Sequence, residues 1–127
     1  MDTGKVEAWL EAYREAWKTN DPERVGALFA EDARYLTSPF DDPWEGRAQI
    51  VESWTEETDE EEQFDLRSEV LATNDQRAVV RCWVVYWNAD RSEPQEEFST
   101  IWLIDFDAED RCTEFTEWYM ERPKPPL

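Results

Sequence analysis

The sequence predicts an α+β protein in which three N-terminal helices pack on a curved antiparallel sheet. Apolar residues recur every three or four positions up to about residue 60, which is typical of amphipathic helices. From residue 64 onward, four stretches rich in apolar residues follow one another between short turn-forming segments, which is typical of strands. The chain has 127 residues and no internal repeat, so residues 1–127 are expected to form a single domain.

The first half of the chain holds the three predicted helices. The first spans residues 4–18, and its apolar positions are Val6, Trp9, Leu10, Tyr13 and Trp17. The second begins after Asp21, because aspartate caps a helix N-terminus and Pro22 fits the first helical position. Its apolar face continues to Phe29. The third is predicted over residues 46–60, around Ile50 and Trp54.

Four strands are predicted in the second half, over residues 64–72, 77–87, 97–106 and 111–120. The two middle strands carry apolar residues on both faces. In an antiparallel sheet with one solvent-exposed face, apolar and polar residues should alternate along each strand. If the helices cover one face, the other presents an apolar patch of the kind that marks an interface. We therefore expect a homodimer packed sheet to sheet through the outer residues Trp83, Val85, Trp87, Ile101 and Leu103.

The net charge of −19, from 13 basic and 32 acidic residues, makes nucleic acid and anionic membranes unsuitable partners. The densest acidic run, residues 56–62, is either a cation site or a solvated helix end, and we favour the helix end. No apolar run approaches the ~20 residues of a membrane span, and the N-terminus does not resemble a signal peptide. We therefore expect a cytoplasmic protein.

The sequence contains no histidine, which removes Ser–His and Cys–His nucleophiles and the usual ligands of zinc. The two cysteines, Cys82 and Cys112, lie in strand-like sequence and are expected to be small buried residues. We therefore expect neither a metal nor a cofactor.

Three stretches carry a family resemblance: "DPERVGALFAEDARYLTSPF", then "EGRAQIVESW", and finally "FTEWYMERP". In this order, followed by strands as described, they resemble the nuclear transport factor 2-like superfamily, and within it the small bacterial SnoaL-like proteins. The resemblance implies a cone-shaped fold with a ligand pocket between the helices and the concave face of the sheet. The superfamily includes polyketide cyclases, steroid isomerases, epoxide hydrolases and non-catalytic binding modules, so the fold alone selects no function.

The steroid isomerases of this superfamily allow a comparison residue by residue. The tyrosine that binds their oxyanion corresponds to Tyr13. Their general-base aspartate lies at or just before the proline of the corner 35–47, where this chain has Thr37 and Ser38, and their protonated aspartate corresponds to Trp102. Since a missing base costs roughly 10²–10⁴-fold in rate, the resemblance does not extend to steroid isomerisation.

The SnoaL-like cyclases use an acidic or histidine side chain and no metal or cofactor. Glu117 is the best candidate for this acid or base, with Tyr13 as a second proton-transfer group. Alternatively, Glu117 points to solvent or pairs with an arginine. The resemblance also implies a pocket for a small apolar or aromatic molecule, lined by Tyr13, Trp17, Tyr35, Phe40, Trp54, Trp102, Phe115, Glu117 and Tyr119.

Three functions therefore remain open. The leading one is a small-molecule-binding domain, and the second is a cyclase- or isomerase-type enzyme that uses Glu117 and Tyr13. The third is a dimerisation module whose many aromatic residues fill the core and leave no cavity. An open cavity beside Tyr13, Trp102 and Glu117 would favour the first two functions, and a filled centre would favour the third.

Overall fold

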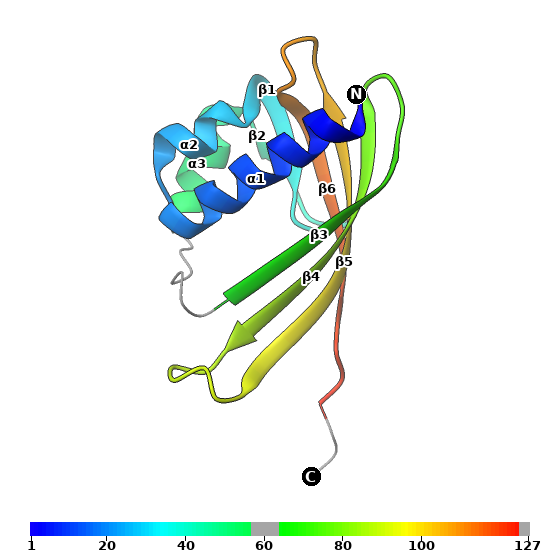
Figure 1. Ribbon diagram of the computed structural model, residues 1–127. Coiled ribbons are helices and arrows are strands. Elements are labelled where there is room, and N and C mark those ends of the chain that lie inside the picture. The colour runs from blue at the N-terminus through cyan, green and yellow to red at the C-terminus, as the bar shows by residue number, and fades with distance from the viewer. Residues whose placement is uncertain (57–63, 125–127) are drawn as a thin grey trace.

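A computed structural model describes residues 1–56 and 64–124, which form helices and one sheet (Figure 1). The helices are α1 (Thr3–Thr19), α2 (Pro22–Ala27) and α3 (Arg47–Glu56). The strands are β1 (Phe29–Leu36), β2 (Trp44–Glu45), β3 (Phe64–Thr73), β4 (Arg77–Trp87), β5 (Pro94–Phe106) and β6 (Cys112–Glu121). The last four strands match the predicted ones to within three residues at each end. No helix in the described residues is long and apolar enough to cross a bilayer.

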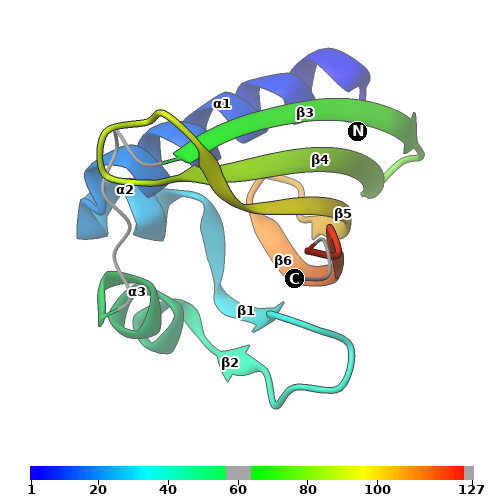
Figure 2. The ribbon, with the colours of Figure 1, turned by 90° about the horizontal axis from the view of Figure 1, so that it is seen from below.

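The six strands form one sheet in the order β2-β1-β6-β5-β4-β3. Neighbouring strands are antiparallel, except that β1 and β6 run parallel. The sheet curves around the helices (Figure 1), and its edge strands β2 and β3 lie on opposite sides of the molecule when seen from below (Figure 2). The sheet is therefore mixed and open, and its concave face meets the helices.

The helices begin where the sequence predicts. The side chain of Asp2 accepts a hydrogen bond from the backbone of Lys5 at the start of α1. Asp21 does the same for Glu23 at the start of α2, with Pro22 in the first turn. For α3, residues 57–60 of the predicted helix lie outside the described residues, as does most of the acidic run 56–62.

The predicted second helix is wrong beyond Ala27, because the chain enters β1 at Phe29. Apolar positions in residues 28–36 fit a helical period as well as a strand, so the local pattern did not decide between them. Pairing decides it: Phe29 lies opposite Cys112, whose N–H donates to the carbonyl of Leu28 at 2.8 Å. Strand β1 thereby supplies partners for backbone groups along one side of β6.

The corner 35–47 is a hairpin between β1 and β2, in which Tyr35 pairs with Trp44. The N–H of Gly46 donates to the carbonyl of Ala33 at 2.7 Å, with a φ of 86° that glycine adopts without a Cβ penalty. Phe40 lies at the tip of the hairpin and is 99% exposed, so its prediction as a pocket wall is wrong. The turn carries this side chain away from the core.

Candidate functional site

A cavity of about 170 Å³ lies between the helices and the concave face of the sheet. Its walls come from α1, α3 and five of the six strands, with Thr37 from the turn between β1 and β2. The lining residues are Tyr13, Trp17, Tyr35, Thr37, Trp44, Trp54, Tyr86, Trp102 and Glu117. Six of the nine residues predicted from the sequence thus surround one space. We call this space the inner cavity.

A second hollow of about 530 Å³ shares Trp17, Tyr86 and Glu117 with the inner cavity and continues along the concave face toward the free ends of β4 and β5. We call it the outer hollow. The residues that line it are Trp17, Val84, Tyr86, Glu96, Phe98, Thr100, Glu117, Tyr119 and Glu121. Tyr119, predicted as a pocket residue, lines this outer part, and Glu117 lies at the junction of the two spaces.

Glu117 is half-buried on β6, directly opposite Trp102 on β5. The indole Nε1 of Trp102 donates a hydrogen bond to Oε2 of Glu117 at 2.6 Å. Burial raises the pKa of this carboxyl group, and the hydrogen bond from Trp102 opposes the rise. Oε2 is therefore held in place, while Oε1 is available to a molecule in the cavity. An arginine partner, one form of the alternative considered for Glu117, is not found among the described residues.

The hydroxyl groups of Tyr13 and Tyr35 lie 2.9 Å apart and share a buried hydrogen bond. Burial raises the pKa of both, and the charge of Glu117 adds to the rise, so both hydroxyls stay protonated. Because only one of the two protons is used between them, the pair retains one O–H that can donate to a ligand.

Phe115 packs behind the tyrosine pair and lines neither space, which corrects its prediction as a pocket residue. Its ring stacks on Tyr35, with centroids 4.5 Å apart and an angle of 3° between the planes. It also stacks on Tyr13 at 5.8 Å and 9°. Phe115 is fully buried and therefore fixes the two tyrosines from behind.

Several lining residues were not predicted. Phe98 shares the inward face of β5 with predicted Trp102, and Tyr86 lies on the inward face of neighbouring β4, so the same alternation could have identified both. Trp44 belongs to a two-residue strand that leaves no periodic signal. Thr37, at the position of a base in the steroid isomerases, donates its hydroxyl proton to exposed Asp41 at 2.6 Å and offers no carboxylate to the cavity.

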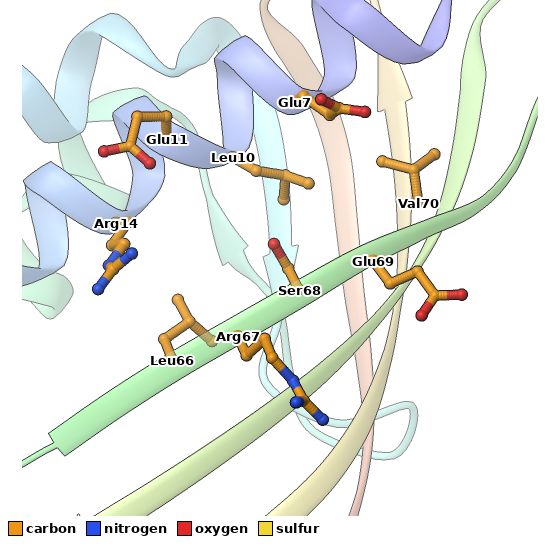
Figure 3. A pocket seen from close by; sticks show the side chains of 9 residues that line it. All are labelled: Glu7, Leu10, Glu11, Arg14, Leu66, Arg67, Ser68, Glu69 and Val70. Carbon is orange, nitrogen blue, oxygen red and sulfur yellow. The ribbon is translucent and has the colours of Figure 1, made fainter.

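A third space, of about 570 Å³, lies between α1 and the edge strand β3 (Figure 3). Leu10 points toward β3 there, and Ser68 and Val70 point toward the helix, whereas Arg67 and Glu69 point away from it. Charged residues of both signs line it, and none of the predicted site residues does. Both cysteines are buried and free, and burial raises the pKa of Cys82 to about 12, so it is an unreactive thiol.

The convex face of the sheet carries the predicted interface residues, all half-buried in the single chain. Trp83 lies between two guanidinium groups, 4.2 Å from that of Arg67 and 4.4 Å from that of Arg81. On neighbouring β6, Trp118 is 46% exposed and Met120 is 74% exposed. The most exposed apolar surface of this face therefore lies on β6.

Solved structures with a similar fold share little sequence with this chain. A candidate ketosteroid isomerase from Kribbella flavida DSM 17836 has a TM-score of 0.70 and 20% identity, covering 99% of this chain and 85% of that chain. SalBIII, an epoxide hydrolase/cyclase-like enzyme in pyran ring formation in polyether salinomycin, has a TM-score of 0.71 and 16% identity over 94% of this chain and 93% of its own.

A third solved structure is a protein with a ketosteroid isomerase-like fold from Catenulispora acidiphila DSM 44928, in complex with trimethylamine. It has a TM-score of 0.64 and 16% identity, covering 87% of this chain and 84% of that chain. A comparison with curated proteins gave no match. The profile of the SnoaL-like domain matches residues 10–115, which is most of the chain. The chain therefore belongs to the family of SnoaL-like domains.

Proposed function

We propose that this SnoaL-like domain binds a small organic molecule whose flat apolar part occupies the inner cavity. The observation that carries the proposal is the cavity itself, which aromatic rings line and which meets Glu117 on one side. Its volume of about 170 Å³ exceeds the ~150 Å³ that suffices for benzene in an apolar cavity. This space argues against the filled core that a purely structural module would have.

Tryptophan signals in NMR spectra offer a test with internal controls. The eight indole N–H groups divide by position, since four belong to residues that line the inner cavity: Trp17, Trp44, Trp54 and Trp102. Trp83 and Trp118 lie on the convex face. Adding 2-naphthol, a flat aromatic probe, should shift the four cavity signals in a saturable manner. Shifts confined to Trp83 and Trp118, or none at millimolar probe, would contradict the proposal.

A second candidate function is proton transfer by Glu117. Burial raises the pKa of Glu117, which makes its carboxylate a stronger base, and the Tyr13–Tyr35 pair retains an O–H that can donate to developing negative charge. Proton abstraction needs both a base and such a donor, so these features favour this function. The probe is 5-nitrobenzisoxazole, a flat ring that opens to a coloured phenolate when a base removes its C3 proton. Glu117→Gln should abolish any acceleration, and Glu109→Gln, on an exposed turn, should leave it unchanged.

We also propose that two copies pair through the convex face. Half-buried Trp83, Val85, Trp87, Ile101 and Leu103 support this assembly, as does the exposed apolar surface of Trp118 and Met120 beside them. The indole N–H of Trp87 already has a hydrogen-bond partner within the chain, since its Nε1 donates to Asp65 at 2.9 Å. The contact is therefore centred toward β5 and β6.

A further inference from the structure

We propose that the outer hollow holds the positively charged ammonium group of a ligand, whose flat part lies in the inner cavity. This inference rests on the proposed function and adds the chemical class of the ligand, an organic amine or quaternary ammonium compound. Four observations carry it: the arrangement of the aromatic rings, the charge of the lining, one buried hydroxyl group, and the continuity of the two spaces.

The aromatic rings of the outer hollow form an angled wall rather than a stack. Tyr86 and Phe98 have centroids 6.0 Å apart and planes at 89°. Phe98 and Tyr119 are likewise 6.0 Å apart, at 76°, and Trp17 lies 6.5 Å from Tyr86 at 59°. Neighbouring rings along this wall therefore stand at steep angles to one another, and all four belong to residues that line the hollow. Aromatic faces attract cations, and a box of rings is the usual recognition site for quaternary ammonium groups.

The charge of the lining is negative throughout. Glu96, Glu117 and Glu121 line the hollow, and no lysine or arginine of residues 1–56 and 64–124 does. Each of the three lies opposite an aromatic residue on the neighbouring strand, in the pairs Tyr86–Glu96, Phe98–Glu121 and Trp102–Glu117. None of the three forms an ion pair within the described residues. A cation in the hollow would give these carboxylates a counter-charge and would relieve the cost of half-burying Glu117.

Thr100 supplies an independent indication of a ligand. Its side chain lines the hollow and is only 3% exposed. Within the described residues its Oγ1 has no oxygen or nitrogen partner, and its one hydrogen-bonding neighbour is the thiol of Cys82 opposite on β4, a weak donor. Thr100 lies across from Tyr119, one step along the strand from Trp102 on the same face. Buried hydroxyl groups in folded proteins are nearly always paired. A polar group of a ligand beside Tyr119 and Glu117 is positioned to pair with this one.

A neutral aromatic molecule explains fewer of these observations. It would fit the inner cavity, but it would leave three carboxylates beside apolar ligand surface and would bring no counter-charge. The net charge of −19 also raises the local concentration of cations near the protein and lowers that of anions. The observations therefore favour a ligand with one flat end and one cationic end.

The test compares a cation with an uncharged molecule of the same shape. Choline and 3,3-dimethylbutan-1-ol differ in a quaternary nitrogen that replaces a carbon atom, so shape and hydroxyl group are conserved. Titration calorimetry and indole shifts should show choline binding at least tenfold more tightly, with shifts at Trp17, and the preference should shrink as salt is added. Equal affinities, or no choline binding below 50 mM as an order-of-magnitude ceiling, would overturn the proposal.

Variants locate the effect. Glu96 and Glu121 are both exposed. Replacing them with glutamine should lower the affinity for choline at least fivefold and leave the affinity for 3,3-dimethylbutan-1-ol unchanged. Glu109→Gln is the control for charge alone. Tyr119→Leu should lower the affinity for choline, whereas Tyr119→Phe should keep it at the wild-type value. The reason is that the ring face, and not the hydroxyl group, attracts the cation. Unaltered choline affinity in the glutamate variants would refute the assignment to this hollow.

The 2-naphthol experiment separates this inference from the proposed function. If 2-naphthol shifts the four cavity indoles and choline binds no better than its isostere, the cationic assignment fails and the binding function stands. If neither probe shifts those signals, both fail. Choline binding that depends on Glu96 and Glu121, without binding of 2-naphthol, supports the outer site and overturns the aromatic occupant of the inner cavity.

Discussion

The hydrogen bond from Trp102 to Glu117 makes a quantitative prediction about the pKa of the carboxyl group. A hydrogen bond to a charged group contributes about 1.5–3 kcal/mol, and most of this contribution is specific to the ionised carboxylate. Each 1.36 kcal/mol corresponds to about a factor of ten in proton affinity. Removing the donor should therefore raise the affinity of Glu117 for its proton by about ten- to a hundredfold, so its pKa rises further above the ordinary value.

Trp102→Phe removes the donor but also leaves a gap, because the indole is 1% exposed and its centroid lies 4.7 Å from that of Tyr13. A second variant carries benzothienylalanine at position 102, which keeps the shape of the indole and replaces N–H with sulfur. The pKa of Glu117 is measured by carbon-13 NMR of the carboxyl group, with Glu117→Gln to assign the signal. Agreement between the two variants would attribute the change to the lost donor.

Trp87→Phe is the matched control, because it removes an indole donor to Asp65 on the convex face. It should leave the pKa of Glu117 where it was. An unchanged or lowered pKa of Glu117 in both variants at position 102 would show that the hydrogen bond does not hold the carboxylate, and would refute the account of the site given above.

Three further predictions concern stability and assembly. Because the pKa of Glu117 lies above its ordinary value of 4.5 in the folded state, its contribution to stability is complete below pH 4.5 and is lost as the pH rises through the folded pKa. Glu117→Gln should therefore gain stability relative to the wild type across that window, and a constant difference would contradict this. Phe115→Ala should lower the free energy of unfolding in urea by about 3–5 kcal/mol, and Phe40→Ala by less than about 0.5 kcal/mol. Equal losses of stability in the two variants would contradict the assignment of Phe115 to the core and of Phe40 to the surface. In sedimentation at micromolar concentration the protein should be a dimer that Trp118→Glu dissociates, and a wild-type monomer would exclude the convex-face contact.

Sequence periodicity predicted the elements whose partners are close in the chain. The strands β3 to β6 pair with their sequence neighbours, and their alternation placed Glu117 and Trp102 on the concave face. Alternation gives the face of each residue but not the register between strands. The direct pairing of Trp102 with Glu117 was therefore beyond the reach of the sequence, as was the hydroxyl contact between Tyr13 and Tyr35.

The errors have a common physical origin in contacts between distant segments. The first residue of β1 was assigned to the second helix and the rest of β1 was not predicted as a strand, because its partner β6 lies some eighty residues later and no local pattern reports that pairing. Phe40 was assigned to the pocket from the family resemblance, whereas the hairpin between β1 and β2 carries it into solvent. Phe115 faces the concave side as predicted, but the rings of Tyr13 and Tyr35 lie between it and the cavity.

The parallel pairing of β1 with β6 has a consequence for synthesis on the ribosome. The helices and the β1–β2 hairpin leave the ribosome first, yet one long side of β1 has no partner until residues 112–121 follow. Until then, Tyr35 lacks the ring of Phe115, on which it stacks in the folded protein with centroids 4.5 Å apart, and exposed aromatic surface of this kind attracts chaperones. Because Glu117 also belongs to β6, the proposed site is complete only after the last strand has been synthesised.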